Sequence, residues 1–384
     1  MSTFVPLLTS AQAAQLSDRS REVVEYRKSG LSLNHVMGCP LDCAYCIRHT
    51  YGAWDLRQPR ALVTDAEAVE LLVTHPYFQR NVTPVQVFNR ATDPFLPKVK
   101  DHTFAVLEDL DSRGLRNHVL VITRYRVDPE DCARLNALTS VRVTLLFTYS
   151  GIDDKRIEPF DKAVAEKSLR TAAPLAAQYR TVFYWRPLVP GLNDTPQHLA
   201  RAVELSRLAH ASVFTGLFYR DEIADYYRAN GIPEPYEDTA RRKIVPETME
   251  ARILAAFAAG HGGSLFRKTS CAVSYAHGVP DYNGHYGIRE LCDICPVKQL
   301  DLCAQHHRVP SPVELRGIAA RLPAAEGFEV IDVTDRAAVV AGLDEQPRYY
   351  LQHAFGFQIH DVRHPHRSRR HGRAEIGWTE DTPA

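Results

Sequence analysis

The sequence predicts an α/β fold built on a parallel sheet. Apolar strand candidates alternate with helical patterns along most of the chain, and these strands are apolar on both faces, as in parallel sheets covered by helices. No Gly-x-Gly-x-x-Gly follows any of them, so a dinucleotide-binding fold is disfavoured. The pattern fits either a doubly wound sheet or a barrel. The strand candidates are residues 33–37, 84–89, 118–123, 141–147, 181–185, 212–218 and 263–267.

The helices between these strands have start signals of their own. Thr64 and Glu67 form a capping box before the helix expected at 66–72. Thr195 followed by Pro196 supplies a cap and a first-turn proline before the helix expected at 197–208. The strand and helix signals therefore agree on repeated strand–helix units.

Length and composition indicate one large domain with an appendage. The chain has 384 residues and a formal net charge of zero, so no field over the whole molecule attracts nucleic acid or anionic membrane. No apolar run approaches the roughly 20 residues of a membrane span, and the N-terminus does not resemble a signal peptide. We expect a cytoplasmic protein whose eight cysteines act as metal ligands or thiols rather than disulfides.

The most informative motif is Cys39-x3-Cys43-x2-Cys46, close behind a short apolar run. Three cysteines at this spacing suit a loop around a 4Fe-4S cluster, with one iron left open for another ligand. The aromatic residue Tyr45 before the last cysteine strengthens this interpretation. A zinc site is the alternative, but zinc prefers four ligands in paired knuckles.

A second cysteine group follows the last strand candidate. Its members, at spacings x20, x2 and x7, are Cys271, Cys292, Cys295 and Cys303. Four thiols make a complete ligand set for a second iron-sulfur cluster or a structural zinc, and free thiols are a third possibility. The sequence leaves these alternatives open.

The cysteine loop resembles the radical SAM superfamily, and further motifs are similar to its spore photoproduct lyase-like branch. In order along residues 33 to 220 these are Asn89-Arg90-Ala91-Thr92-Asp93-Pro94-Phe95-Leu96-Pro97, Thr123-Arg124, Ile157-Glu158-Pro159 with Arg170 behind it, and Arg186-Pro187-Leu188-Val189-Pro190-Gly191-Leu192-Asn193-Asp194. The resemblance implies a partial (β/α)6 TIM-like barrel of the radical SAM type. It also implies a 4Fe-4S cluster that binds S-adenosylmethionine (SAM), with the chemistry at the carboxyl ends of the strands.

The same resemblance implies a shell of SAM-binding residues. Acceptors for the ammonium group are expected at Thr92 and Asp93, beside Asn89, and a cation for the carboxylate at Arg170 or, in competition, Arg124. The ribose is expected near Thr148 and Ser150, and the adenine near the turn of Asn193. Glu158 is either part of this shell or the structural partner of an arginine.

Beyond the barrel we expect a cysteine-rich extension and a small C-terminal domain. The expected divisions are an N-terminal segment (1–30), the barrel (31–267), an auxiliary cluster region (268–307) and an α/β appendage with a basic tail (308–384). Residues 220–260 are expected as a surface excursion, with a lid over the barrel mouth as the alternative. The appendage is expected to have helices at 310–321 and 334–343, and strands at 328–333 and within 349–362. The tail from Arg363 to Arg373 is expected to be solvated and disordered, with a nucleic-acid-binding arm as the alternative.

These observations predict a radical SAM enzyme that removes a hydrogen atom from a small-molecule or natural-product-type substrate. Extensions after the barrel often carry auxiliary clusters in this superfamily, so a second 4Fe-4S cluster is expected at the C-terminal cysteines. The expected partner is an electron donor such as flavodoxin or ferredoxin; we expect no membrane, and a nucleic-acid partner is disfavoured. The alternatives are a nucleic-acid repair enzyme of the photoproduct lyase type and a non-catalytic iron-sulfur or zinc protein.

Overall fold

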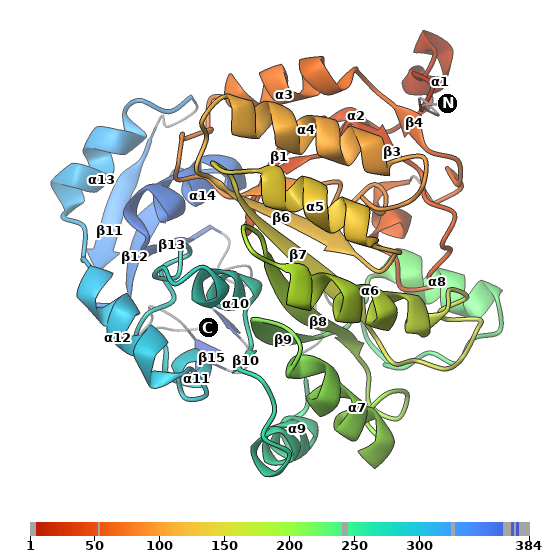
Figure 1. Ribbon diagram of the computed structural model, residues 1–384. Coiled ribbons are helices and arrows are strands. Elements are labelled where there is room, and N and C mark those ends of the chain that lie inside the picture. Colours follow the sequence, from red (N-terminus) through yellow and green to blue (C-terminus); the bar gives the residue numbers. More distant parts are fainter. Residues whose placement is uncertain are drawn as a thin grey trace.

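A computed structural model describes residues 5–52, 54–239, 245–323, 327–363, 370–371 and 374–375. Its body is one eight-stranded sheet in the order β1-β2-β5-β6-β7-β8-β9-β10 (Figure 1). From β2 to β10 each strand runs parallel to the next, and β1 adds an antiparallel edge. The strands span Val24–Arg27 (β1), Gly30–Leu33 (β2), Val85–Val87 (β5), His118–Thr123 (β6), Arg142–Tyr149 (β7), Arg180–Leu188 (β8), Ala211–Gly216 (β9) and Leu265–Phe266 (β10).

The strand order decides between the two architectures that the sequence allowed. Parallel strands that follow one another in chain order, each joined by a right-handed crossover, place all their helices on one face of the sheet. A doubly wound sheet would instead reverse its strand order. The sheet begins at β1 and ends at β10, so the barrel is open. The predicted α/β fold with a partial barrel is confirmed.

Helices α3 to α7 cover the outer face of this sheet (Figure 1). The predicted capping box of Thr64 and Glu67 is present at the start of α3, and Thr195 caps α7. The helices of the barrel and its N-terminal segment span Ser10–Ala14 (α1), Asp18–Arg21 (α2), Asp65–Val73 (α3), Lys100–Ser112 (α4), Pro129–Ala137 (α5), Lys162–Leu175 (α6), Pro196–Ser206 (α7), Asp221–Ala229 (α8) and Glu247–Ala259 (α9).

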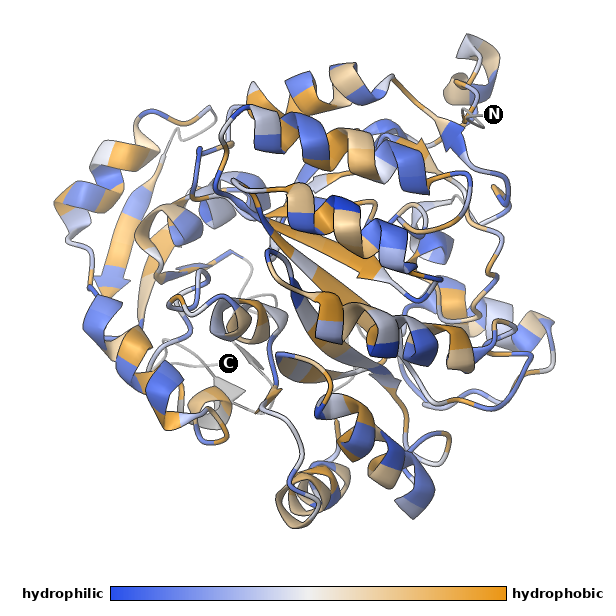
Figure 2. Ribbon diagram, in the orientation of Figure 1, coloured by the Kyte–Doolittle hydropathy of each residue, from blue (hydrophilic) through white to orange (hydrophobic). Residues whose placement is uncertain are grey.

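The two faces of the sheet pack against different parts of the chain. Val143 and Leu145 of β7 belong to the large core under the outer helices. Leu146, the next residue after Leu145, points to the opposite face and belongs to a second core with Ala272 and Val273 of α10 (Thr269–Ala276). In Figure 2 the central strands are mostly hydrophobic, whereas the covering helices alternate between hydrophobic and hydrophilic residues. The cysteine-rich extension therefore fills the inner side of the barrel.

The first strand differs from the prediction of 33–37. The sheet strand is β2, which ends at Leu33, and Val36–Met37 forms a separate strand, β3, that pairs with Arg60–Ala61 (β4). The continuous apolar pattern hides the break between the two strands. The cysteine loop consequently leaves from β3, and the 3-10 helix η1 (Ile47–Tyr51) follows it.

The segment after β9 is not a surface excursion, and that prediction is wrong. Ile223 and Tyr227 of α8 are buried in a core that also contains Ala44 of the cysteine loop and Ile157. This helix also contacts η1. The apolar side of α8 packs against the cysteine loop because this contact removes apolar surface of both the helix and the loop from water.

The C-terminal segment forms a three-stranded sheet, β11-β12-β13, with two helices. The predicted helix at 334–343 is wrong: residues Ala337–Ala341 form the central strand β12, because pairing on both sides overrides the helix preference of alanine. The predicted strands within 349–362 are half wrong, because a helix runs to Phe355 and ends at Gly356 in the left-handed conformation. The elements after β10 span Arg289–Cys292 (α11), Val297–His306 (α12), Pro312–Ala319 (α13), Glu329–Val333 (β11), Ala337–Ala341 (β12), Glu345–Phe355 (α14), Gln358–Asp361 (β13), Arg370–His371 (β14) and Ala374–Glu375 (β15).

A buried polar network joins this C-terminal segment to the rest of the chain. The hydroxyl of Tyr26 lies 2.7 Å from Nδ1 of His353, whose Nε2 lies 2.6 Å from Oδ1 of Asn283 in the extension. Gln352 donates to the same oxygen. Three distant segments thus share one set of hydrogen bonds.

Most of the basic tail lies outside the described residues. Among the residues that are described, no helix has the length and hydropathy required to span a membrane.

Two buried histidines should make the fold sensitive to acid. They are His118, at the start of β6, and His277, at the carboxyl end of α10. Burial, with a smaller effect of Arg142, lowers the pKa of His118 to about 3, and burial lowers that of His277 to about 2. Both are neutral when folded but bind protons below pH 6.5 when unfolded, so the unfolded state gains more protons as the pH falls. The free energy of unfolding of the metal-free protein should therefore decrease from pH 6.5 downwards, by at most about 1.4 kcal/mol per pH unit for each histidine.

Urea unfolding at pH 7.5, 6.0 and 5.0 measures this dependence. The double variant His118→Gln, His277→Gln should show a shallower decrease, and the exposed His306→Gln control should behave as the wild type. Equal slopes in the wild type and the double variant would contradict the prediction.

Candidate functional site

The cysteine loop is held at the carboxyl ends of the barrel strands by backbone hydrogen bonds. The N–H of Gly38 donates to the carbonyl of Ala91 at 3.0 Å, and the N–H of Ala44 donates to that of Ile157 at 2.9 Å. Gly38 has a φ of 100°, and a Cβ there would lie 2.5 Å from the carbonyl oxygen of Gln58. Only glycine fits this approach of two backbone segments.

Arg48 fixes the far side of the loop. It is 2% exposed, and it donates to the carbonyl oxygens of Trp54 at 3.2 Å and Leu56 at 3.1 Å. No motif in the sequence points to this residue. Its position two residues after Cys46 gives no signal, because an arginine beside a cysteine motif is ordinarily a surface residue.

The thiols of Cys39 and Cys43 are buried and that of Cys46 is half-buried, and none forms a disulfide. Burial raises the pKa of Cys39 and of Cys43 to about 12, although Arg48 and Arg124 respectively act to lower it. Such thiols lose their protons when they bind a metal ion, because the positive metal compensates the charge of the buried thiolates. The donor set thus fits an iron-sulfur cluster held by one loop.

Arg124 brings a cation to these thiols from the end of β6. Its Nη1 lies 3.3 Å from Sγ of Cys43 and donates to the hydroxyl of Tyr45 at 2.6 Å. The same atom lies 3.4 Å from Oε2 of Glu158, which also accepts hydrogen bonds from the hydroxyls of Tyr45 and Ser150. Of the two roles considered for Glu158, the structure shows the partner of an arginine.

Asp93 and Thr92 connect the neighbouring strand ends. The carboxylate of Asp93 accepts from the hydroxyl of Thr123 at 2.7 Å and from the N–H of Arg124 at 2.8 Å. Burial raises the pKa of Asp93, and these hydrogen bonds offset part of the rise. Thr92 donates to the carbonyl of Gly38 at 2.5 Å, which leaves its oxygen able to accept from a ligand. Asp93 therefore positions Arg124 as well as lying in the predicted shell.

The remaining predicted residues divide into two kinds. Asn193 is fully buried and bonds to the N–H of Val189 and the carbonyls of Pro187 and Ser150, so it fixes the turn after β8. Asn89 donates to Gln86 and accepts from the hydroxyl of Ser32. By contrast, the hydroxyl of Thr148 is buried and has no hydrogen-bond partner within the described part of the chain.

The structure does not bring Arg170 to this site. Arg170 lies on α6 with 39% of its side chain exposed, and it pairs with Glu166 and Glu204 on the outer surface. The prediction that Arg170 meets a ligand carboxylate is wrong, because the side chain points away from the strand ends. Of the two candidates, Arg124 is the one that the fold places beside the cysteines.

The four C-terminal cysteines line one pocket between α10, α11 and α12. Its other walls include Asp281, His285 and Gln299. Gln299 donates to Sγ of Cys303 at 3.4 Å, and Cys292 donates to the carbonyl of His285 at 3.5 Å. Burial raises the pKa of all four thiols, that of Cys295 to about 12. Residues up to 32 positions apart thus converge on one potential ligand set.

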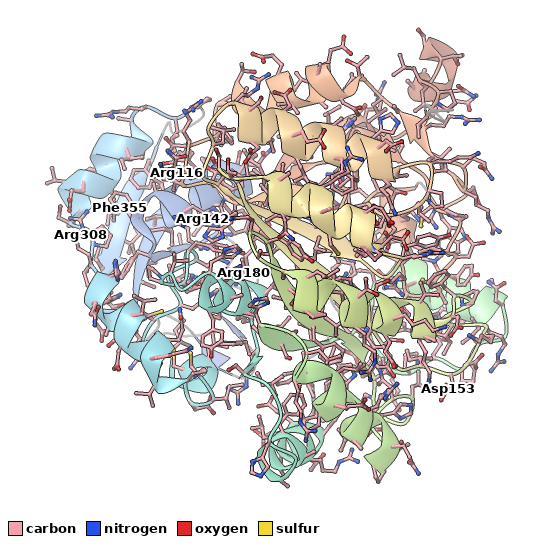
Figure 3. All side chains as sticks on the ribbon, in the orientation of Figure 1. Arg116, Arg142, Asp153, Arg180, Arg308 and Phe355 are labelled. Carbon is pink, nitrogen blue, oxygen red and sulfur yellow. The ribbon has the colours of Figure 1, made fainter. Side chains whose placement is uncertain are left out.

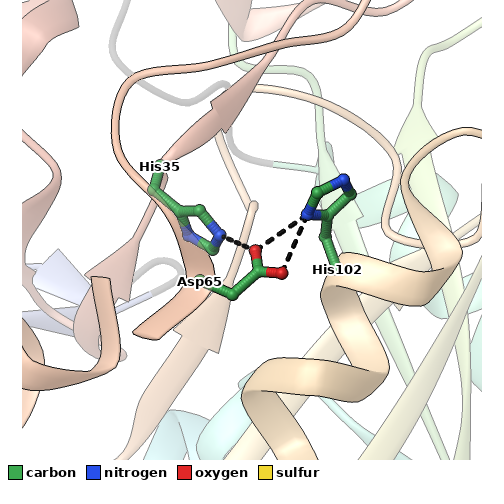
Figure 4. A group of neighbouring side chains, drawn as sticks. All are labelled: His35, Asp65 and His102. Carbon is green, nitrogen blue, oxygen red and sulfur yellow. Dashed lines mark hydrogen bonds and ion pairs between the residues drawn. The ribbon is translucent and has the colours of Figure 1, made fainter. Parts of the chain in front are cut away.

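A further cluster, His35, Asp65 and His102, resembles a metal site but is a structural clamp (Figure 4). Nε2 of His35 lies 2.7 Å, and Nδ1 of His102 2.8 Å, from Oδ1 of Asp65. Nε2 of His102 accepts from the N–H of Val5 at 3.2 Å, so its proton is on Nδ1 and that atom cannot ligate a metal. Burial would raise the pKa of Asp65, but the hydrogen bonds from both histidines outweigh it and lower the value to about 2. The clamp ties the residue before β3 to α3 and α4.

Comparison with solved structures gives distant likenesses. A spore photoproduct lyase variant matches with a TM-score of 0.49 and 13% identity over 69% of this chain and 86% of that one. Another variant, with bound AdoMet and dinucleoside spore photoproduct, matches with a TM-score of 0.48 and 14% identity, over 68% and 85%. Streptococcus suis SuiB bound to S-adenosylmethionine matches with a TM-score of 0.43 and 8% identity, over 67% and 54%. No protein-family model matches the chain, and neither does any curated protein sequence.

The buried pair of Arg124 and Glu158 should be a strong determinant of stability. Their side chains are 14% and 4% exposed, so Arg124→Met leaves a buried carboxylate without its cation. The free energy of unfolding should fall by about 3–5 kcal/mol, as measured by chemical denaturation of the metal-free protein.

Arg170→Met is the matched control. Because that pair is exposed, its loss should change the free energy of unfolding by less than about 1 kcal/mol. A similar effect of the two substitutions would contradict the assignment of Arg124 to a buried network.

Proposed function

We propose that the protein is a radical SAM enzyme. The observation that supports this most directly is the combination at one end of the barrel of three thiols on one loop with Arg124 against Cys43. A loop of three thiols suits a 4Fe-4S cluster with one open iron, and SAM needs a cation for its carboxylate within reach of that iron. When bound, the cluster and SAM supply reductive cleavage to methionine and a 5′-deoxyadenosyl radical, with one electron from a donor such as flavodoxin or ferredoxin.

Each residue of the site has a defined task in this proposal. Cys39, Cys43 and Cys46 would hold the cluster, and Arg124, fixed by Asp93 and Glu158, would orient the carboxylate of SAM. Thr92 would accept from the ammonium group. The buried hydroxyl of Thr148 needs a hydrogen-bond partner, and the ribose of bound SAM would supply one. Such a polar shell argues against a non-catalytic metal protein, which has no use for it.

The enclosed setting of the site suits radical chemistry. Helix α8 packs over the cysteine loop through Ile223 and Tyr227, and α10 fills the inner side of the barrel. By packing on the loop, α8 would help to keep water and quenchers from the strand ends, which a cofactor of this kind requires. We propose a small-molecule or natural-product-type substrate, which would lose a hydrogen atom there.

We further propose a second 4Fe-4S cluster at Cys271, Cys292, Cys295 and Cys303. The support is that all four thiols line one pocket and are raised in pKa by burial. Four protein thiolates complete the coordination of a cluster, so it would have no open iron. Its role would be to accept an electron, which favours a net oxidation of the substrate.

Anaerobic reconstitution with iron and sulfide, followed by SAM and dithionite, tests the main proposal. We expect 5′-deoxyadenosine by chromatography, and none when Cys39, Cys43 or Cys46 is changed to Ala, because the thiolates alone hold the cluster. Cys132→Ala is the matched control: that cysteine is buried away from the loop, and the variant should keep cleaving SAM. Undiminished cleavage in the triple loop variant would refute the assignment.

Iron analysis tests the second cluster separately. The reconstituted wild type should hold about eight irons per chain, and a variant without the loop cysteines or one without the four C-terminal cysteines should hold about four. If the variant without the loop cysteines contained zinc and no iron, the C-terminal site would be a zinc site. The assay for 5′-deoxyadenosine would still test the proposed cluster at the cysteine loop.

A further inference from the structure

Cations gather at the opposite end of the barrel from the cysteine loop. Arg142 is the first residue of β7 and Arg180 the first of β8, and Figure 3 shows them following Arg116 along this edge. His118, the first residue of β6, lies opposite Arg142 in the sheet register. Adjacent strands are about 4.8 Å apart, so the backbones that carry these residues are close together.

The extension contributes to the same group. His277 caps the carboxyl end of α10, and its ring lies 5.0 Å from that of His118. Its Nε2 lies 2.9 Å from the hydroxyl of Thr144 on β7. We call the arginines Arg116, Arg142 and Arg180, together with the neutral His118 and His277 beside them, the lower cation cluster.

The charges of this cluster are not neutralised by carboxylates. Within the described part of the chain, Arg116, Arg142 and Arg180 form no ion pair. Arg180 donates instead to the carbonyls of Ala276, at 3.1 Å, and of two neighbouring residues, which fixes its guanidinium without cancelling the charge. The nearby carboxylate of Asp111 accepts from the backbone N–H groups of residues 140 and 141.

Among the described residues, the arginines of this group lack a counter-ion and a buried imidazole nitrogen beside them lacks a partner. His118 is 6% exposed, and its Nδ1 has no hydrogen-bond partner among the described residues. After burial itself, the groups that lower the pKa of His277 most are His118, Arg180, Arg142 and His210, all of them cationic or potentially so. At neutral pH both histidines are uncharged, so the positive charge of the group is that of its arginines. An oxyanion at this position would balance the charge of the arginines and supply hydrogen-bond acceptors for their N–H groups.

We propose that the lower cation cluster binds a phosphate-type oxyanion. Guanidinium groups pair with phosphate oxygens through two parallel hydrogen bonds, and imidazoles can add further donors. The phosphate could belong to a small molecule or to a single-stranded nucleic acid. This site does not depend on the proposed function, because it lies at the other end of the barrel and shares no residue with the cysteine loop.

Binding measurements on the full-length protein test this proposal. Titration calorimetry with inorganic phosphate and with diphosphate, at constant ionic strength set with sodium chloride, should give saturable heat. Arg142→Gln should weaken binding about tenfold or more, the loss expected for one charged hydrogen bond. Within the described residues, the side chain of Arg142 has no hydrogen-bond or ion-pair partner to lose, and Arg116→Gln provides a second variant. The exposed Arg321→Gln is the matched control and should bind as the wild type.

A labelled single strand of 15 thymidines distinguishes the source of the phosphate. If the cluster binds a nucleic acid backbone, fluorescence anisotropy should show binding weakened by Arg142→Gln, with a log–log salt slope of about −2 for three phosphate contacts. Binding of phosphate or diphosphate without binding of the oligonucleotide would assign a small-molecule ligand. No binding of any probe at 10 mM phosphate or micromolar oligonucleotide, or binding unchanged in both arginine variants, would overturn the proposal.

Discussion

The candidate site depends on the charge of Arg124 at the carboxyl end of β6. This guanidinium touches Cys43, Tyr45 and Glu158, and it brings together a loop after β3, a strand end and the segment after β7. Neither charged partner could be buried alone at low cost: the carboxylate of Glu158 needs a cation, and the guanidinium needs an anion. The network therefore fixes the loop geometry and the electrostatics of the site together.

The rest of the fold serves this arrangement from two sides. On the outside, the clamp of His35, Asp65 and His102 anchors the residue from which the cysteine segment departs. On the inside, α10 fills the barrel and carries Cys271 toward the second cysteine pocket. The hydrogen bonds of Asn283 then couple that extension to the C-terminal sheet, so the appendage is part of the support of the second pocket rather than a separate addition.

Sequence reasoning succeeded where local pattern and tertiary environment agree. The strand at His118–Thr123 and the capping box at Thr64 are as predicted, because an apolar run and a cap are each decided within a few residues. It failed for Ala337–Ala341, where alanines suggested a helix and pairing on both sides imposed a strand. It also misplaced Arg170, because a motif gives the order of residues and not the face of the helix on which a side chain lies.

By itself, the sequence determined the alternation of strands and helices and the existence of two cysteine groups, since these are set by hydrophobic periodicity and by residue spacing. Only the tertiary structure decided which arginine meets the cysteine loop and that four cysteines separated by as many as 32 positions share one pocket. It also decided that arginines on adjacent strands form one cation cluster. These are contacts between residues far apart in the chain, and their free energies depend on burial and distance, which have no local signal in the sequence.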